Sequence, residues 1–166
     1  MAIPVGQPAP ELEFVFTLYS DELKPVRLAD FRGKKNVLLL FFPAAFTGVC
    51  STELDQVNNE LDIYENLDTQ VLAISTDAPF TLAEFKKAHG FRFPLLSDHD
   101  AEVSKLYGTK YNRDFTHMKL DRISKRAAFV IDKEGIVRYA EILDDPTQLP
   151  NFDAIKQTLT EIAQPA

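Results

Sequence analysis

The sequence of 166 residues holds one cysteine, Cys50, and no tryptophan. A single cysteine cannot close a disulfide within the chain, which argues against the disulfide-stapled scaffolds of small secreted proteins and favours a reducing compartment. Glycine is also scarce, with six residues, and none of them builds a glycine-rich loop of the kind that binds phosphate. We therefore expect a cytoplasmic protein without a phosphate-binding loop.

Basic residues are outnumbered by acidic ones, and long apolar segments are lacking. The chain has 18 lysines and arginines against 25 aspartates and glutamates, for a formal net charge of -7, which argues against nucleic acid or an anionic membrane as the main partner. No apolar stretch reaches the roughly 20 residues that cross a bilayer, and residues 1–8 lack the basic start and apolar stretch of a secretion signal. The sequence predicts a soluble protein with no nucleic-acid or membrane partner.

Alternating apolar patterns organise the rest of the chain. The run Asn36–Phe42 is apolar after its first residue, as expected of a strand buried on both faces of a sheet. Apolar residues then recur at steps of three and four from Leu54 to Tyr64, which predicts a helix. The further predicted elements are strands over 71–75 and 93–96, helices over 81–89 and 102–107, a hairpin of strands 127–131 and 136–140, and a last helix over 152–163.

Less regular segments lie between these elements. Residues 12–28 indicate short strands, with a hairpin as one arrangement, and residues 109–125 predict a long loop. Strand-helix units followed by a hairpin and a terminal helix predict an α/β fold of the thioredoxin-like type, with a mixed central sheet and helices on both faces. The length and the absence of repeats favour a single domain over residues 1–166.

Cys50 stands where such a fold would make a thiol reactive. It follows the predicted strand Asn36–Phe42 and directly precedes the amphipathic helical pattern. A helix N-terminus presents unpaired backbone N–H groups and about half a positive charge, which stabilise a thiolate. Position alone makes Cys50 a candidate nucleophile, whereas an isolated cysteine is by default an inert, buried apolar residue.

Residues Pro43, Thr47 and Cys50 match the Pro-x-x-x-Thr/Ser-x-x-Cys signature of the peroxiredoxins, at the strand end and helix start where that family keeps it. The surrounding residues 36–54 are most similar to the one-cysteine, alkyl hydroperoxide reductase E-like branch, and the resemblance covers nearly the whole chain. It implies a thiol peroxidase, without metal or bound cofactor, that reduces hydrogen peroxide, organic hydroperoxides or peroxynitrite through a cysteine sulfenic acid.

The resemblance also implies roles for single residues. Cys50 is the nucleophile, Pro43 shields the site from bulk water, and Arg126 supplies a fixed cation near the sulfur and the peroxide. A guanidinium suits that place because it stays protonated and offers several directed donors to an oxygen whose charge is growing. Thr47, three residues before the cysteine, can bring its hydroxyl to the same side. Spacing alone does not distinguish Arg126 from Arg92, Arg113, Arg122 and Arg138.

Two more residues complete the predicted site. Glu53 lies three residues beyond Cys50, where the resemblance implies an acidic residue that pairs with an arginine. Phe46, together with Phe42, would form an apolar collar that keeps the pocket dry and strengthens its electrostatics. Ordinary core packing is the alternative for both rings.

The polar assignments have structural alternatives too. In the alternative for Thr47, the residue serves only as a helix N-cap, and in that for Pro43, it only ends the strand. Arg126 would be a surface residue beside Lys125. Glu53 would be a solvated carboxylate in the first turn of a helix, where acidic residues are favoured in any case.

The absence of a second cysteine decides the second half of a peroxidase cycle. A sulfenic acid at Cys50 returns to the thiol only through another thiol. The reductant is then an external low-molecular-weight thiol or a thioredoxin- or glutaredoxin-like protein, and excess peroxide drives the sulfur onward to the sulfinic state. Family resemblance further implies a homodimer built through loops near the active site.

Other functions are weighed against this one. A disulfide reductase would need a Cys-x-x-Cys pair, and a glutathione peroxidase would normally carry a tryptophan; the sequence has neither. A non-catalytic redox-sensing or interaction module, in which oxidation of Cys50 changes a partner interface, is the remaining alternative.

Histidines and a short acidic cluster predict no metal site. The histidines of the chain are His89, His99 and His117. They share no metal-ligand spacing with one another or with Cys50. The cluster of Asp98, Asp100 and Glu102 lacks the glycine and the distal glutamate of a calcium loop, which predicts a solvated loop and helix start.

Overall fold

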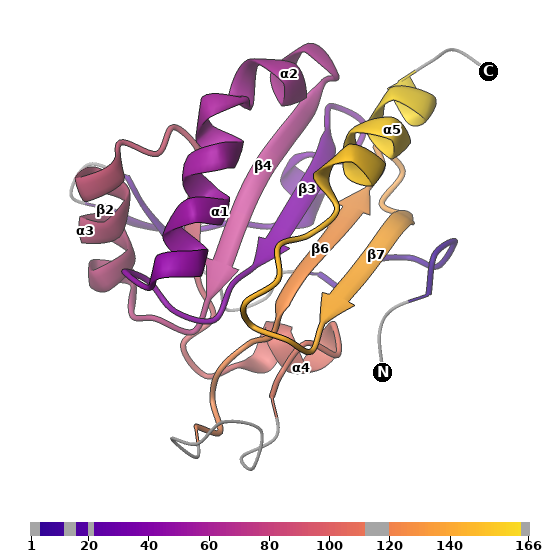
Figure 1. Ribbon diagram of the computed structural model, residues 1–166. Helices are drawn as coiled ribbons and strands as arrows, with labels where there is room; N and C mark the ends of the chain where they lie inside the picture. Colours follow the sequence, from indigo (N-terminus) through magenta and orange to yellow (C-terminus); the bar gives the residue numbers. More distant parts are fainter. Residues whose placement is uncertain (1–3, 12–15, 20–21, 112–119, 164–166) are drawn as a thin grey trace.

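A computed structural model describes residues 4–11, 16–19, 22–111 and 120–163. The strands are β1 (Phe16–Tyr19), β2 (Glu22–Pro25), β3 (Asn36–Phe41), β4 (Thr69–Ser75), β5 (Leu95–Ser97), β6 (Arg126–Ile131) and β7 (Val137–Leu143). The helices are a 3-10 turn η1 (Leu28–Asp30), α1 (Gly48–Asn59), α2 (Leu61–Asn66), α3 (Pro79–His89), α4 (Glu102–Leu106) and α5 (Phe152–Ala163) (Figure 1). Within these described ranges, no helix has the length and apolar character that crossing a membrane requires.

The strands form a mixed sheet in the order β2-β1-β5-β4-β3-β6-β7. The central strands β3, β4 and β5 run parallel, whereas β6 and β7 on one side and β1 and β2 on the other join antiparallel. The pairing of β1 with β2 confirms the hairpin arrangement for residues 12–28, of which 12–15 and 20–21 lie outside the described residues. The predicted hairpin of β6 and β7 is confirmed as well.

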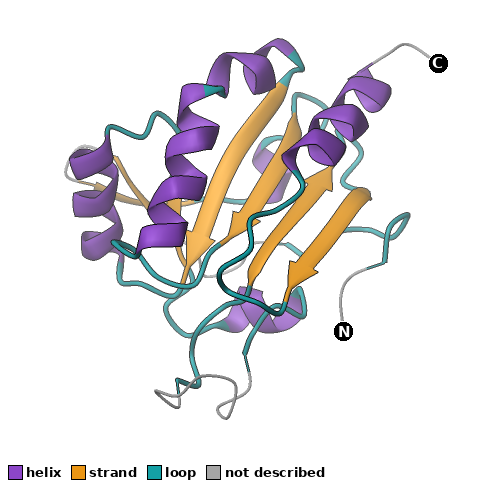
Figure 2. Ribbon diagram, viewed as in Figure 1, coloured by secondary structure: helices purple, strands orange, loops and turns teal. Residues whose placement is uncertain are grey.

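Successive side chains of β3 point into two apolar layers, as the pleat of a strand requires. Leu38 and Leu40 belong to a buried cluster with residues of α1, α2, α3 and α5, whereas Val37 and Leu39 belong to a second cluster with Val103 of α4. All six residues of β3 are buried. Figure 2 shows α1 and α5 lying over one side of the sheet. The predicted mixed sheet with helices on both faces is therefore confirmed.

The helix predicted from Leu54 to Tyr64 is in fact two helices. α1 ends at Asn59 and α2 begins at Leu61, with Glu60 between them at φ -106° and ψ 15°. The apolar positions of the predicted face stay buried on both sides of the break. Spacing at three and four residues therefore predicts burial correctly here and helix continuity wrongly.

Helix ends elsewhere agree with their sequence signals. α3 ends at His89, and Gly90 follows in the left-handed conformation at φ 69°, which glycine adopts without the steric cost of a side chain. The last helix, α5, has the bounds expected from its apolar pattern, Phe152–Ala163.

The predicted solvated loop at the acidic cluster is wrong for Asp98. This side chain is 3% exposed and accepts hydrogen bonds from the backbone N–H of Val103 at 3.0 Å and from both the N–H and the hydroxyl of Ser104 at 2.7 Å. Burial raises the pKa of Asp98, although these hydrogen bonds oppose the shift. The carboxylate satisfies N–H groups at the start of α4 that would otherwise lack partners. Asp100 and Glu102 are exposed, as predicted.

Part of the predicted loop 109–125 can be described. Residues 112–119 lie outside the described residues. On either side of them, the backbone N–H of Tyr111 donates to the carbonyl oxygen of Ile123 at 2.9 Å. This pairing returns the chain to the start of β6, where Arg126 is located.

Candidate active site

Cys50 lies in the first turn of α1, which begins at Gly48. Residues 42–47, which we call the active-site loop, connect the end of β3 to this helix. The cysteine is a free thiol and is 1% exposed. Its sulfur is therefore shielded from water and lies near the positive end of a helix, as the sequence predicts.

Arg126 is brought to Cys50 by strand pairing. It begins β6, which pairs antiparallel with β3 so that Ala127 lies opposite Phe41, the last residue of β3. The guanidinium nitrogens Nη1 and Nη2 each donate a hydrogen bond to the Cys50 sulfur at 3.4 Å. Because Arg126 is 1% exposed, its interpretation as a surface residue is wrong.

Glu53 reaches the same guanidinium from one turn further along α1. Its Oε1 accepts a hydrogen bond from Arg126 Nη1 at 2.8 Å, and the side chain is 0% exposed. The interpretation of Glu53 as a solvated carboxylate is therefore wrong. Burial raises the pKa of Glu53 to about 7, although the charge and the hydrogen bond of Arg126 act to lower it. Burial thus favours the neutral form of Glu53, whereas the neighbouring guanidinium favours its carboxylate.

Arg126 remains a cation at this buried position. Burial acts to lower the pKa of the guanidinium, but the charges and hydrogen bonds of Glu53 and Cys50 more than offset that effect, so the pKa is raised. Within the described part of the chain, Arg126 Nε and Glu53 Oε2 are buried and have no hydrogen-bond partner. Such groups are uncommon in folded proteins.

Arg126 has a further acceptor in the carbonyl oxygen of Pro146, which accepts a hydrogen bond from Nη2 at 3.0 Å. A turn after β7 presents this carbonyl, because Asp145 Oδ1 accepts hydrogen bonds from the N–H of Thr147 at 2.9 Å and from its hydroxyl at 2.6 Å. An Asp-Pro-Thr sequence signals a turn, but nothing in its spacing indicates a contact with Arg126. Sequence analysis therefore missed this part of the site.

Thr47 occupies the N-cap position of α1 without capping it through its side chain. Its hydroxyl instead donates to the carbonyl oxygen of Ala44 at 2.9 Å, across the active-site loop. The residue is exposed. The structure thus places Thr47 at the helix start, three residues before Cys50, with its hydroxyl hydrogen donated to Ala44 and its oxygen still able to accept.

The remaining residues of the active-site loop differ in burial. Phe42 is 0% exposed and packs in the core, with its ring centroid 6.1 Å from that of Phe85. Phe46 is 54% exposed, with its ring centroid 5.0 Å from Phe85, so ordinary core packing is correct for Phe42 and wrong for Phe46. Pro43 is half-buried and follows the strand end, a position that fits both of its interpretations.

The histidines of the described residues take part in protein contacts. His89 Nδ1 lies 3.1 Å from Asp55 Oδ1, and its ring stacks on Phe91. His99 Nδ1 lies 3.2 Å from the carbonyl oxygen of Thr76. His117 lies outside the described residues. In the described ranges, no group of three or more potential metal-binding side chains comes together.

Comparison with known proteins decides the family. Residues 5–140 match the AhpC/TSA family. The chain belongs to that family. This AhpC/TSA protein is 45% identical over 141 residues to alkyl hydroperoxide reductase E of Mycobacterium tuberculosis, covering 83% of this chain and 84% of the relative. It is also 32% identical over 149 residues to a chloroplastic 2-cysteine peroxiredoxin of Chattonella marina var. antiqua, covering 86% of this chain and 72% of the relative.

Solved structures agree with this assignment. The crystal structure of the reduced 2-Cys peroxiredoxin of Plasmodium vivax matches the AhpC/TSA protein with a TM-score of 0.82 at 30% identity, over 95% of this chain and 81% of that one. The thioredoxin-like fold predicted from the sequence is confirmed. The predicted resemblance to the alkyl hydroperoxide reductase E-like branch is confirmed too, and the protein is a thiol peroxidase that works through a cysteine sulfenic acid.

Proposed function

We propose that Cys50 is the peroxide-reducing nucleophile and that Arg126 activates it. The supporting observation is the pair of 3.4 Å contacts from the guanidinium to the sulfur of a buried cysteine. A cation fixed beside the sulfur stabilises the thiolate, and its N–H groups also lie close to a peroxide that approaches that sulfur. Exclusion of water strengthens both interactions.

The proposed reaction is a displacement at oxygen. The Cys50 thiolate attacks one peroxide oxygen, a sulfur–oxygen bond forms, and the oxygen–oxygen bond breaks. The leaving oxygen departs with the bond's electron pair. From hydrogen peroxide or an organic hydroperoxide it takes up a proton to give water or an alcohol, and from peroxynitrous acid, the protonated form of peroxynitrite, it leaves as the nitrite anion without a proton. Sulfur is thereby oxidised by two electrons to the sulfenic acid. Pro43 keeps water from the site, and the Thr47 hydroxyl turns from Ala44 to the peroxide.

Reduction of the sulfenic acid requires an outside thiol, because Cys50 is the only cysteine. We propose that a low-molecular-weight thiol or a thioredoxin- or glutaredoxin-like protein attacks the sulfenic sulfur. The first thiol forms a mixed disulfide and releases water, and a second thiol frees Cys50 and leaves as the oxidised disulfide. Without that thiol, a second peroxide oxidises Cys50 to the sulfinic state.

We further propose a cytoplasmic homodimer formed beside the active-site loop. Phe46 in the loop is 54% exposed, and Phe80 in the first turn of α3 is 66% exposed. The N–H of Ala45 donates to Asp77 at 2.8 Å, which links the loop to the segment before α3. Exposed aromatic side chains are enriched at protein interfaces. Sedimentation should show a dimer for the native chain and a monomer for Phe80→Asp; a native chain that is monomeric at every concentration would contradict the proposal.

Rapid mixing of the reduced protein with near-stoichiometric hydrogen peroxide tests the peroxidase assignment. Thiol titration and intact mass should show loss of one thiol and gain of one oxygen, far faster than free cysteine reacts, and none of this in Cys50→Ser. Added dithiol should then restore the thiol for repeated turnovers. A rate no better than free cysteine, with oxidation that instead alters binding to another protein, would favour the redox-sensing alternative.

A further inference from the structure

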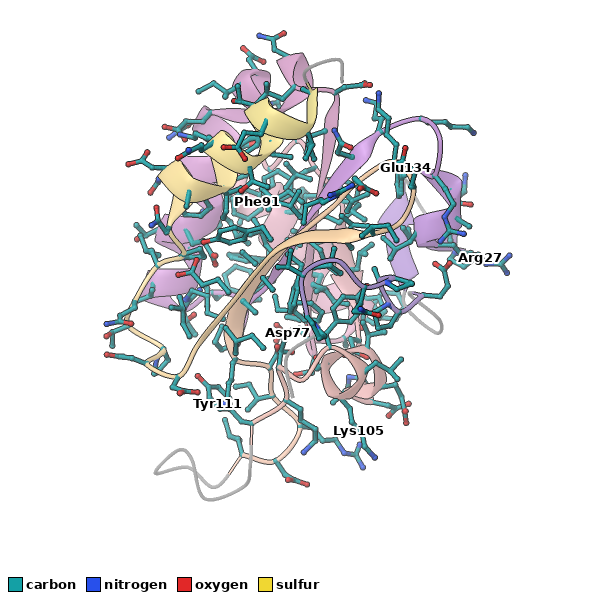
Figure 3. The ribbon with its side chains drawn as sticks, turned by 90° about the vertical axis from the view of Figure 1, so that its right-hand side faces the viewer. Arg27, Asp77, Phe91, Lys105, Tyr111 and Glu134 are labelled. Carbon is teal, nitrogen blue, oxygen red and sulfur yellow. The ribbon has the colours of Figure 1, made fainter. Side chains whose placement is uncertain are left out.

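The active-site loop is tied to the sheet by a side chain outside it. Asp77, labelled in Figure 3, follows the end of β4. Its Oδ2 accepts a hydrogen bond from the backbone N–H of Ala45 at 2.8 Å. Ala45 lies five residues before Cys50 in the chain. This contact connects the segment that leads into the nucleophile with a residue 32 positions away in sequence.

Asp77 is itself fixed from several sides. The oxygen that accepts the Ala45 N–H also accepts the hydroxyl of Ser75 at 2.6 Å. The backbone N–H of Asp77 donates to that same Ser75 hydroxyl at 3.2 Å, and its carbonyl oxygen accepts the Ser97 hydroxyl at 2.7 Å. Ser75 and Ser97 lie in the neighbouring strands β4 and β5 and are buried. The carboxylate is therefore a rigid acceptor anchored in the sheet.

The loop needs such an anchor, because Phe46 has a strained backbone. Its φ of 64° lies in the left-handed region, which costs a residue with a side chain roughly 1–2 kcal/mol. The start of the loop is fixed at Phe42, which is buried and whose N–H donates to the carbonyl oxygen of Ile74 at 3.0 Å. Beyond it, the ring of Phe46 packs near Phe85, and the hydroxyl of Thr47 donates to Ala44 within the loop itself. Both Phe46 and Thr47 are exposed, so the half-buried hydrogen bond from Ala45 to Asp77 is what ties the middle of the loop to the sheet.

We infer that Asp77 is a positioning residue for Cys50, because its hydrogen bond to Ala45 holds the active-site loop closed. This inference rests on the proposed function. Closure keeps the sulfur beside Arg126 for attack on peroxide, as catalytic geometry requires. However, Cys50 is 1% exposed, so a protein thiol can reach its sulfenic acid only when the loop opens. The same hydrogen bond therefore favours oxidation of Cys50 and opposes its reduction by a protein.

Two substitutions separate the acceptor from the rest of the side chain. Asp77→Ala removes the acceptor of the Ala45 N–H. Asp77→Asn keeps a carbonyl oxygen of the same shape that can accept from both Ala45 and Ser75. We expect Asp77→Ala to slow oxidation of Cys50 by hydrogen peroxide about tenfold, as for loss of one hydrogen bond, and to speed reduction of the sulfenic acid by a thioredoxin-like dithiol protein. Asp77→Asn should restore most of both rates.

The control variant is Asp132→Ala. Asp132 lies in the hairpin between β6 and β7, where its carboxylate likewise accepts backbone N–H groups, those of Glu134 and Ile136, each at 3.0 Å. Loss of this residue destabilises a turn without contact to the active-site loop. It should lower the free energy of unfolding but leave the ratio of the two rates unchanged. Hydrogen exchange should rise at the amides of the active-site loop in Asp77→Ala and not in Asp132→Ala.

Opposite changes in the two half-reactions are the result that supports this role. The inference is overturned if Asp77→Ala leaves both rates within twofold of the native chain, or if both fall together as in a merely destabilised protein. It is also overturned if Asp77→Asn behaves like Asp77→Ala. Failure of the proposed function looks different, since the native chain itself would then react with hydrogen peroxide no faster than free cysteine.

Discussion

Arg126 donates hydrogen bonds from both terminal nitrogens to the sulfur of Cys50, at 3.4 Å each. The two residues lie 76 positions apart and meet because β6 pairs with β3, the strand that leads to the helix of the cysteine. Glu53 and the Pro146 carbonyl take other N–H groups of the same guanidinium. The cation is thus oriented by three acceptors, of which the sulfur is the reactive one.

Replacement of Arg126 by alanine should slow oxidation of Cys50 by hydrogen peroxide on the order of a hundredfold, by analogy with loss of one donor to a developing oxyanion. The measurement is stopped-flow oxidation of the reduced protein. Arg92→Ala is the matched control, because Arg92 is an exposed arginine paired with Asp62, and it should leave the rate unchanged. Because Arg126→Ala leaves Glu53 buried without its partner, Arg126→Ala with Glu53→Gln should remain slow; recovery of the rate would show that the cation itself is unimportant.

Glu53 should make the native protein less stable as the pH rises toward and above neutrality. Its pKa rises from an ordinary 4.5 to about 7 on folding, so between these values the folded protein binds more protons than the unfolded chain. Stability from this group is therefore fully present below 4.5 and is lost as pH passes through about 7. The difference between these two pKa values corresponds to on the order of 3 kcal/mol.

Urea unfolding of the reduced native protein and of Glu53→Gln, from about pH 5 to about pH 8, measures this effect across the window that the linkage relation defines. The glutamine keeps an acceptor for Arg126 but cannot ionise. The free energy of unfolding of the native protein should therefore fall relative to that of the variant as pH increases. If the free energies of unfolding of the two proteins changed in parallel with pH, the pKa of Glu53 would be ordinary despite its burial.

Much of the fold was predictable because apolar spacing reports burial directly. The run that became β3 and the face of α5 were both assigned from that spacing with nearly correct bounds. The prediction of one continuous helix was wrong at Glu60, because the apolar positions keep the same spacing across the break between α1 and α2. Asp98 was misjudged because its backbone partners, the first N–H groups of α4, carry no signal in the side-chain sequence.

The residues of the candidate site also fall into those that the sequence could indicate and those that it could not. Cys50 could be singled out by its place between a strand and a helix, whereas Arg126 could be chosen only through resemblance to a family. Its burial and its contact with Glu53 depend on strand pairing over a long separation, which residue spacing does not report. The acceptors at Pro146 and the carboxylate of Asp77 were missed, because each acts through backbone groups that every sequence contains.

Asp145→Ala should weaken the site through the Pro146 carbonyl. Loss of the carboxylate removes both hydrogen bonds from Thr147 that hold the turn, so the carbonyl no longer orients Arg126 Nη2. We expect oxidation of Cys50 to slow about fivefold, within the range for small misplacement of a catalytic group. Asp144→Ala is the matched control, since Asp144 pairs with Lys125 at the surface, and its rate should stay within twofold. Equal rates for both variants would exclude a role for the turn.

At position 46 we expect the glycine variant to be more stable than the alanine variant, which is the reverse of the usual order. Glycine normally destabilises a protein relative to alanine because the unfolded chain is more flexible. At φ 64°, however, alanine keeps the strain of the left-handed conformation and glycine removes it, while both lose the contact of the ring with Phe85. Phe46→Gly should therefore be more stable than Phe46→Ala by about 1 kcal/mol.

Urea unfolding of the two variants measures the difference, and each serves as the other's control because both change the same position in the same surroundings. A more stable alanine variant would show that the active-site loop relaxes out of the left-handed conformation at no cost.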